Sequence, residues 1–289
     1  MARVIVDMRT RPPLDTWVQK AQFRQGGVYY PTRAGFPRPR SAEERSVELL
    51  VQELDEACVR WAVIMGRQSA EPTGAIPNDE IAACVARYPD RFLAWAGIDV
   101  TQPIEQCLAE IRRCAKLPGF KGVSIEPAIA RGDRSFWAYE KRFYPIYEEC
   151  LRLDLPVNIT LSGILQMNPG RPYEYASPIQ VYRVAKDFPK LDIHVAHGGW
   201  PSVMDMIGVA FVCPNVWLSP DQYFVKMIPA AREYWKAANY YFQDRTLYSS
   251  NYPSRPHREM IQAYAEWDWA PGVLDRVMGQ NALRLMRMA

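Results

Sequence analysis

Residues 4–13 read VIVDMRTRPP, an apolar run that ends in an aspartate and two arginines. A run of this length indicates one buried strand, and its polar end marks where the chain leaves a core. Short apolar or β-branched runs of this kind recur at fairly even intervals along the chain. There are eight, at residues 4–6, 61–65, 92–98, 120–125, 157–161, 193–196, 216–218 and 245–248.

Stretches with helical periodicity separate the runs. Ser41 to Glu44 form a capping-box pattern, and the apolar stripe from Val47 to Cys58 predicts a helix. Similar periodicity occurs at residues 76–88, 103–117, 140–153, 177–187, 201–212, 229–242 and 257–266. Because helical crossovers join neighbouring parallel strands, the alternation predicts an α/β protein with one (β/α)8 barrel domain over residues 1–289. A doubly wound open sheet is the alternative, but no Gly-x-Gly-x-x-Gly motif follows an early strand.

One long connection, residues 12–40, is rich in proline and arginine and lacks clear periodicity. In a barrel it would follow the first strand, where loops form a lid or a substrate wall. A plain surface loop is an equal alternative.

The composition indicates a folded protein without a nucleic-acid or membrane partner. Of the 289 residues, 48% are hydrophobic, and 35 basic residues nearly balance 32 acidic ones, so no basic surface for nucleic acid is expected. No signal-peptide pattern and no membrane-spanning apolar stretch occur, so we expect a soluble, cytoplasmic protein. Six cysteines without a Cys-x-x-Cys pair are typical of reduced, buried thiols.

The carboxyl ends of the strands carry the active site in a (β/α)8 barrel, so the residues that follow each run are the first candidates. Polar residues follow seven of the runs and predict a polar ring at one end of the barrel. They are Asp7, Arg9, Arg11, Asp99, Glu126, Thr160, Ser162, His194, His197, Ser219, Asp221, Ser250, Asn251 and Tyr252.

Four segments resemble motifs of the amidohydrolase superfamily, in its branch of amidohydrolase-related TIM barrels. HVAHGGWP at 194–201 resembles the sixth-strand His-Gly motif, and DRTLYSSNYPSRP at 244–256 resembles the eighth-strand motif that supplies a catalytic aspartate. VIVDMRTRPP is similar to the first-strand motif Ile-Asp-x-His-x-His-x-Pro, and MGQNALRLM at 278–286 is similar to the closing Gly-x-Asn-Ala-x-Arg-Leu helix. The resemblance covers essentially the whole chain and implies a decarboxylase or hydrolase of small carboxylated compounds.

The chain departs from the family at the positions of the metal ligands. By this resemblance the two first-strand histidines fall on Arg9 and Arg11, the fifth-strand histidine on about Thr160 and the eighth-strand aspartate on Asn251, whereas His197 is kept. A guanidinium has no lone pair to give a metal, and one histidine is too few for a catalytic zinc site. We therefore expect no metal cofactor. A divalent metal such as zinc, held by ligands that the alignment misplaces, is the alternative.

The two arginines indicate an anion site. Arg9 and Arg11 lie two residues apart on a strand, so both guanidinium groups can point into one volume and clamp a carboxylate. The alternative is a buried ion pair of one arginine with Asp7, Glu126 or Asp221.

The predicted site combines these arginines with an acid–base group. We assign catalysis to His197, Asn251 and Asp221, with Asp99 as an alternative, because the ordinary pKa of histidine lies near neutrality. His194, three residues earlier on the same strand, is expected to face the other side and to be structural. Substrate binding is assigned to Arg9, Arg11, Glu126, Thr160, Ser162 and Tyr252.

The predicted activity is metal-independent hydrolysis of a small carboxylated lactone, ester or amide. The alternatives are a lyase or decarboxylase of the same branch, a catalytically inactive protein that binds a small acid, and an ordinary metal-dependent hydrolase. The expected partner is a small anionic substrate. A homo-oligomer is a further alternative, since the aromatic-rich residues 217–242 suit a subunit contact as well as a core.

Overall fold

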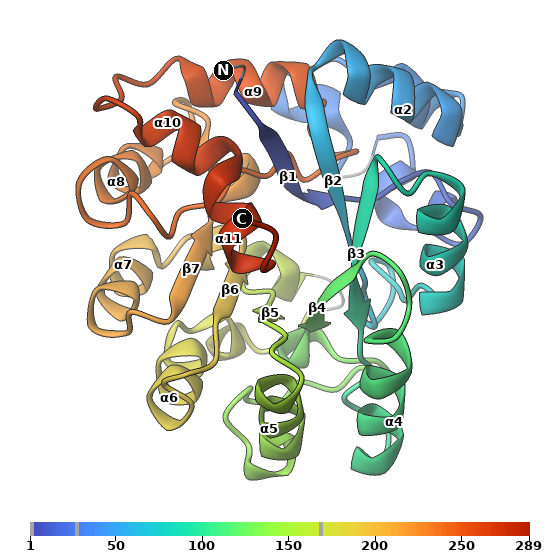
Figure 1. Cartoon of the computed structure of the whole chain (residues 1–289), viewed down its shortest axis with the longest axis vertical. Coiled ribbons are helices and arrows are strands. Elements are labelled where there is room, and N and C mark those ends of the chain that lie inside the picture. Colours follow the sequence, from blue (N-terminus) through green and yellow to red (C-terminus); the bar gives the residue numbers. More distant parts are fainter. Residues whose placement is uncertain (1–2, 27–28, 168–169) are drawn as a thin grey trace.

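A closed barrel of parallel strands forms the core of the chain. The computed structural model describes residues 3–26, 29–167 and 170–289. Seven parallel strands form one sheet, in which neighbours in the chain are neighbours in the sheet. They are β1 (Ile5–Thr10), β2 (Val59–Met65), β3 (Phe92–Gly97), β4 (Phe120–Ile125), β5 (Val157–Ile159), β6 (Ile193–Ala196) and β7 (Val216–Ser219). Because every crossover proceeds in the same direction, the sheet curls around with the helices outside (Figure 1).

Residues 245–252 fill the eighth position of the barrel. The N–H of Leu247 donates to the carbonyl of Leu218 on β7 at 2.9 Å, and the N–H of Met8 on β1 donates to the carbonyl of Tyr248 at 3.1 Å. Isolated parallel bridges join Leu218 to Thr246 and Thr10 to Tyr252. The predicted (β/α)8 fold is therefore confirmed. Within the described residues, however, 245–248 pair only at single positions and do not make a regular strand.

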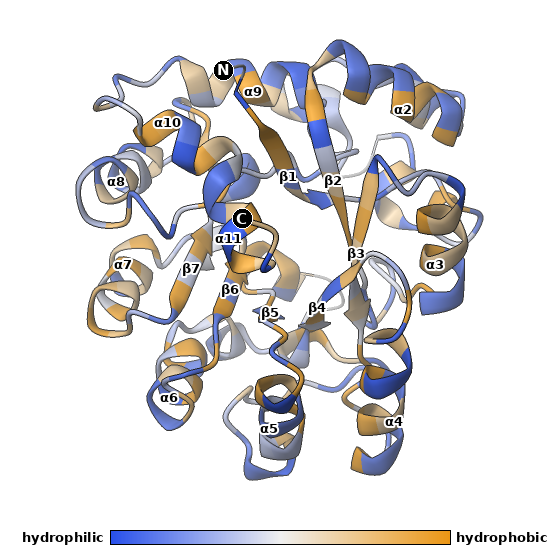
Figure 2. Ribbon diagram, viewed as in Figure 1, coloured by the Kyte–Doolittle hydropathy of each residue, from blue (hydrophilic) through white to orange (hydrophobic). Residues whose placement is uncertain are grey.

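The outer layer consists of the crossover helices. Each carries both apolar and polar residues, as expected for an element with one face on the barrel (Figure 2). They include α2 (Val47–Glu56), α3 (Asn78–Arg87), α4 (Ile104–Cys114), α5 (Tyr144–Arg152), α6 (Ile179–Asp187), α7 (Val203–Val212), α8 (Ala231–Lys236), α9 (His257–Ala265), α10 (Val273–Asp275) and α11 (Asn281–Leu285).

The start of α2 differs from the predicted capping box at residues 41–44. Ser46 is the N-cap, and its hydroxyl accepts the N–H of Leu49 at 3.1 Å. The predicted box lies instead in a separate short helix, α1 (Arg40–Glu43). Arg45 has a left-handed backbone conformation, with φ 54°, which ends the first helix before the second begins.

The six cysteines are free thiols, as expected, and five of them are buried. Cys58 is the exception to the prediction, because it is exposed. It lies beyond the end of α2 with φ 55°, so it is not part of the apolar stripe of that helix.

The amino-terminal end of the barrel is filled with apolar side chains. They are Val6, Met8, Val63, Met65, Leu93, Trp95, Trp217 and Leu247. Trp95 fits because Gly122 on β4 has no side chain, and a Cβ there would lie 2.4 Å from the indole. The C-terminal helix α11 packs Ala282 and Leu285 on this cluster and lies across this end of the barrel (Figure 1).

The segment 12–40, described at residues 12–26 and 29–40, contains three short 3-10 turns and reaches the opposite end of the barrel. These are η1 (Trp17–Gln19), η2 (Ala21–Phe23) and η3 (Pro31–Ala34). Its Gln22 and Tyr29 line a small cavity at the strand ends, together with residues of four other loops. The prediction that this segment acts as a lid stays a prediction.

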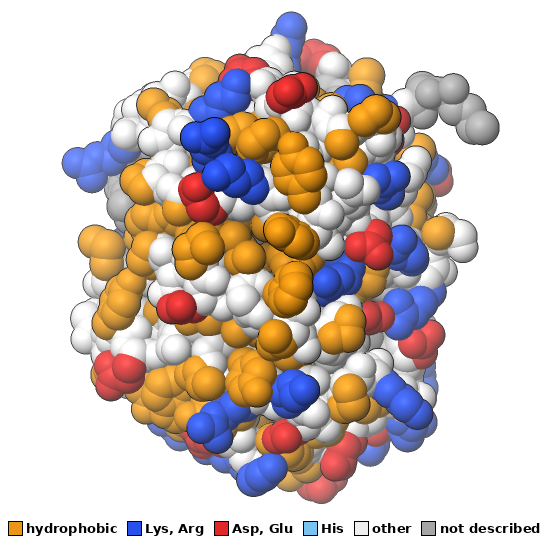
Figure 3. All heavy atoms as spheres, turned by 90° about the vertical axis from the view of Figure 1, so that its left-hand side faces the viewer, with side chains coloured by type: hydrophobic (Ala, Val, Ile, Leu, Met, Phe, Trp, Pro, Cys, Tyr) orange, Lys and Arg blue, Asp and Glu red, His pale blue; other side chains and the backbone are white. Residues whose placement is uncertain are grey.

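Apolar side chains are exposed on the face that carries α7 and α8 (Figure 3). Met204, Phe211 and Val212 of α7 are more than half exposed, and Tyr241 contacts Phe211 with ring centres 5.8 Å apart. The predicted homo-oligomer stays a prediction. No helix among the described residues is both long and apolar enough to cross a membrane.

Candidate active site

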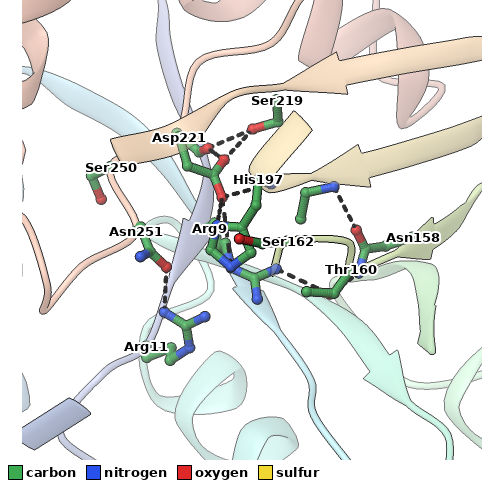
Figure 4. A network of polar contacts seen from close by, with 12 residues as sticks. Arg9, Arg11, Asn158, Thr160, Ser162, His197, Ser219, Asp221, Ser250 and Asn251 are labelled. Carbon is green, nitrogen blue, oxygen red and sulfur yellow. Dashed lines mark hydrogen bonds and ion pairs between the residues drawn. The ribbon is translucent and has the colours of Figure 1, made fainter. Parts of the chain in front are cut away.

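Three residues at the carboxyl ends of neighbouring strand positions share an unusual backbone conformation. His197 after β6, Asp221 after β7 and Asn251 after residues 245–248 have φ values of 67°, 54° and 61°. Such left-handed conformations disfavour residues other than glycine, and in folded proteins they cluster at functional sites. All three side chains are buried and lie close together at the same end of the barrel (Figure 4).

Asp221 holds His197 through two contacts. Its Oδ2 lies 3.0 Å from Nδ1 of the imidazole and accepts the main-chain N–H of the same histidine at 3.1 Å. Its Oδ1 accepts the hydroxyls of Ser219, at 2.5 Å, and Ser249. Burial, followed by the charge of Arg9, lowers the pKa of His197 to about 4, so the imidazole is neutral at pH 7.

The pKa of Asp221 is also lowered. Burial favours the protonated carboxyl, but the contacts with His197 and the charge of Arg9 outweigh it. The pair is therefore an ionised carboxylate beside a neutral imidazole. The 3.0 Å contact does not have the geometry of a hydrogen bond, but the adjacent negative charge favours the tautomer with its proton on Nδ1, which leaves Nε2 to act as a base.

Arg9 lies in the middle of the barrel mouth, between two carboxylates. Its Nη2 is 3.7 Å from Glu126 and its Nε is 3.9 Å from Asp221, while Nη1 donates to the hydroxyl of Thr160 at 3.4 Å (Figure 4). Arg9 therefore forms buried ion pairs with Glu126 and Asp221, which was the alternative to an anion clamp.

Glu126 mainly holds another arginine. Arg67 donates to both of its carboxylate oxygens, at 2.8 and 2.7 Å, and Ser69 donates a third hydrogen bond. Burial alone would raise the pKa of Glu126, but Arg67 lowers it to about 2, so the carboxylate stays ionised.

Arg11 differs from the other two arginines. Its Nη1 donates to Oδ1 of Asn251 at 2.7 Å (Figure 4), and its side chain is only 3% exposed. No ion pair between Arg11 and a carboxylate occurs among the residues that the structure describes. Burial, followed by repulsion from Arg9 and Arg67, lowers its pKa, which means that its positive charge is poorly compensated.

Asp7 fixes the end of β1 instead of pairing with an arginine side chain. Its Oδ1 accepts the N–H groups of Arg9 and Ser250, both at 2.9 Å, and its Oδ2 lies 3.1 Å from Nε2 of His257. Burial would raise the pKa of Asp7, but the contact with His257 outweighs it. These bonds tie β1 to the loop that carries Asn251.

The remaining predicted residues lie at the edge of the site or outside it. Ser162 contacts the hydroxyl of Tyr223 at 3.0 Å, whose ring lies against His197. Tyr252 does not line the cavity: its hydroxyl contacts Ser41 at 2.6 Å. Asp99 accepts bonds from its own loop and pairs with Arg131 at 3.3 Å. It is therefore not part of the acid–base group.

His194 is separate from His197, as predicted. It is fully buried beside Trp95, with ring centres 5.6 Å apart, and neither ring nitrogen has a hydrogen-bond partner in the structure. Burial lowers the pKa of His194 to about 3, so this ring is neutral as well.

A small cavity lies between these groups. It is lined by Arg11, Gln22, Tyr29, Arg67, Ile164, Leu165, His197, Gln222, Asn251 and Ser254. Its volume is about 10 Å³, roughly that of one water molecule, so a larger ligand must displace side chains of the covering loops. The guanidinium groups of Arg11 and Arg67 line this cavity, and its described lining residues include no Asp or Glu, so the wall carries positive charge.

Sequence reasoning missed several of these residues. Arg67 lies two positions beyond the end of β2, the one run without a predicted site residue, although the strand-end rule applies there as well. Gln22 and Ser254 carried no signal, since they lie in loops whose path depends on the folded chain. His257 begins α9, and its partner Asp7 is 250 positions away.

The fold and the site define a class: a (β/α)8 barrel with an acid–base pair and buried arginines at the carboxyl ends of its strands. The chain belongs to the amidohydrolase family, whose sequence model matches residues 14–288. A solved structure, the uncharacterized TIM-barrel protein Bb4693 of Bordetella bronchiseptica, is 30% identical and has a TM-score of 0.88, with 98% of each chain covered.

Two curated relatives are lyases by name. A 2-keto-4-carboxy-3-hexenedioate hydratase from a Sphingobium species is 30% identical over 149 residues, which are 47% of this chain and 43% of the relative. A gamma-resorcylate decarboxylase of Rhizobium radiobacter is 28% identical over 116 residues, which are 39% of this chain and 35% of the relative. The chain thus spans less than half the length of these relatives.

The expectation that no cofactor is needed is wrong for this group of proteins. A dihydroxybenzoic acid decarboxylase of Polaromonas, with 16% identity, a TM-score of 0.66 and coverage of 99% of this chain and 97% of that one, was solved with bound manganese. The donor set in the present chain does not match such an ion, because no three His, Cys, Asp or Glu side chains among the described residues come together to hold a metal.

Proposed function

We propose that this protein is a lyase, a decarboxylase or a hydratase, that acts on a small carboxylated compound. The observation that carries the proposal is the buried Arg11, which lines the cavity beside His197 and has no carboxylate partner among the described residues. A carboxylate in the cavity would supply the missing negative charge. The two lyases among the relatives support this reaction class over the hydrolysis that the sequence favoured.

The roles of the residues follow from their contacts. Arg11, held by Asn251, binds the carboxylate, and Arg67, held by Glu126, adds positive charge to the same wall. The neutral His197 exchanges a proton at Nε2, while Asp221 keeps the ring oriented through Nδ1. Both lyase reactions use such a group. In dehydration the free Nε2 removes a proton from carbon as water leaves, and in decarboxylation Nε2 first takes a proton from solvent water or from a substrate hydroxyl and then gives it to the carbon that loses CO2.

The proposal is tested by incubating the purified protein with 2,6-dihydroxybenzoate and with small unsaturated and hydroxylated di- and tricarboxylates. Proton NMR separates loss of CO2 from gain or loss of water, and each reaction is run with and without added Mn²⁺. We expect turnover of at least one compound, and a loss of about 100-fold or more in kcat/KM for Arg11→Met. Arg24→Met, at an exposed arginine of the segment 12–40, is the matched control and should leave turnover unchanged.

Two results would count against the proposal. Hydrolysis of an ester or lactone without any lyase activity would restore the hydrolase, and tight binding of carboxylates without turnover would make the protein a binder of small acids. If Arg11→Met and the wild type had the same kcat/KM, Arg11 would not be the group that binds the substrate carboxylate.

A further inference from the structure

Gln22 is a buried polar side chain without a partner in the wall of the cavity. It is 3% exposed and lies in η2, and neither its amide nitrogen nor its amide oxygen makes a hydrogen bond with any residue that the structure describes. Buried amides are almost always hydrogen-bonded, because an unmade bond costs the full desolvation of the group. An orphaned amide in a cavity wall therefore points to a ligand that completes it.

Ser254 repeats this pattern on another wall of the same cavity. It is 1% exposed, and its hydroxyl has no hydrogen-bond partner within the described part of the chain. Its position is fixed by the main chain, since its N–H donates to the carbonyl of Asn251 at 3.0 Å. The same turn thus presents the amide that holds Arg11 and an unpaired hydroxyl.

The two orphaned groups have the same chemistry. Each is uncharged, and each can both donate and accept a hydrogen bond. A hydroxyl group on the ligand can donate to the amide oxygen of Gln22 and accept from Ser254. A second carboxylate could only accept and would leave the amide oxygen unpaired, while an apolar group would leave every one of these atoms unpaired.

We propose that Gln22 and Ser254 form a hydroxyl-recognition subsite, which selects carboxylates that carry a hydroxyl group over the same compounds without one. The inference rests on the proposed function, because Arg11 is taken to hold the carboxylate of the same ligand. It assigns substrate selection to the segment 12–40 and to the loop after residues 245–248, and neither Gln22 nor Ser254 contacts the His197–Asp221 pair through a hydrogen bond among the described residues.

Binding of matched probes tests the subsite. The affinities of benzoate and of 2-, 3- and 4-hydroxybenzoate are measured by calorimetry for the wild type, Gln22→Met and Ser254→Ala. We expect the best hydroxybenzoate to bind the wild type at least about tenfold more tightly than benzoate, because the analogue without the hydroxyl leaves the polar groups unpaired. In both variants the ratio of the affinities for the best hydroxybenzoate and for benzoate should fall toward one, while the affinity for benzoate itself changes little.

The controls separate this proposal from the one on which it rests. Gln19→Met, at an exposed glutamine of the neighbouring turn η1, should keep the wild-type ratio. Arg11→Met should weaken the binding of all four probes by the same factor. If it does not, the proposed function fails, but the ratio of the affinities for hydroxybenzoate and benzoate still tests the subsite. A wild-type ratio of one, or an equal loss of all probes in Gln22→Met and Ser254→Ala, overturns the subsite. If no probe binds, both proposals are overturned for this class of acids.

Discussion

Asp221 contacts both the ring and the backbone of His197, with Oδ2 lying 3.0 Å from Nδ1 and 3.1 Å from the main-chain nitrogen. One carboxylate oxygen therefore fixes the left-handed turn at the end of β6 and the orientation of the imidazole together. Replacing the carboxylate with a neutral amide should disturb the orientation and the protonation of the ring without removing the ring from the site.

We expect Asp221→Asn to lower kcat by a factor on the order of 100 to 10,000, because the amide does not hold a proton on Nδ1 as the carboxylate does. KM should change much less, since in the proposed function the substrate is bound by Arg11, which is held by Asn251 and not by Asp221. Ser219→Ala is the control: it removes a hydroxyl that donates to Asp221 and should cost tenfold or less in kcat, about the effect of one lost hydrogen bond. Steady-state kinetics of the two variants check this, and an unchanged kcat in Asp221→Asn would contradict the assigned pair.

Acid should destabilise the folded protein through His197. The pKa of this histidine is lowered from 6.5 to about 4 in the folded state, so between these values the unfolded chain binds a proton that the folded chain does not. His197 should thus lower the free energy of unfolding by on the order of 3 kcal/mol as the pH drops from 6.5 toward 4. His194, whose pKa is lowered to about 3, adds a loss of similar size over the same pH range. Glu126, with a pKa lowered to about 2, adds a further loss at still lower pH. Urea titrations at a series of pH values measure this slope, which should be shallower in His197→Gln.

Periodic features of the chain could be predicted from its sequence, and features set by loop paths could not. The alternation of runs and helices predicts the barrel because strands and amphipathic helices leave a local pattern in the chain. The strand-end rule also identifies Arg9, Arg11, His197 and Asp221, since parallel strands bring their carboxyl ends together.

The side chains that Arg9 and Arg11 contact could not be predicted in the same way. Both Arg9 and Arg11 sit at the end of β1, yet one lies between two carboxylates and the other is held by an amide, which depends on distances across the barrel. The capping box at residues 41–44 failed because Arg45 breaks the helix and Ser46 is an equally good cap. Gln22 lies in the segment 12–40, which has no periodicity, so its position in the cavity wall could not be predicted.

Breaking the pair of Arg67 and Glu126 should be costly. Glu126→Gln leaves Arg67 without its carboxylate and removes one of the two carboxylates that flank Arg9. Because all these groups are buried, we expect a loss of about 3 to 5 kcal/mol in unfolding free energy. The exposed pair of Arg113 and Glu110 is the comparison, and Glu110→Gln should cost about 1 kcal/mol or less. Urea unfolding at pH 7 measures both. Similar losses for the two variants would show that burial does not set the cost.

The N-cap of α2 offers a test of the corrected helix start. Ser46→Ala removes the hydroxyl that accepts the N–H of Leu49 and should cost about 1 kcal/mol, whereas Ser46→Asp should retain most of the stability. Thermal and urea unfolding of the two variants provide the measurement. If Ser46→Ala and the wild type have the same stability, Ser46 does not act as the N-cap.

Gly279, in the π-helical turn Arg276–Gln280 before α11, should not tolerate a side chain. A Cβ at this position would lie 2.1 Å from the carbonyl oxygen of Val4, and main-chain atoms at the start of β1 cannot move aside as a flexible side chain can. We expect Gly279→Ala to lower the unfolding free energy by about 1 to 3 kcal/mol, the usual cost of overpacking, or more. Gly208→Ala on α7 is the matched control, because its Cβ would meet no atom within 4 Å and alanine favours the helix by up to about 1 kcal/mol. Urea midpoints should therefore move in opposite directions, and a shift of the same sign in both variants would contradict the close approach of the C-terminal turn to β1.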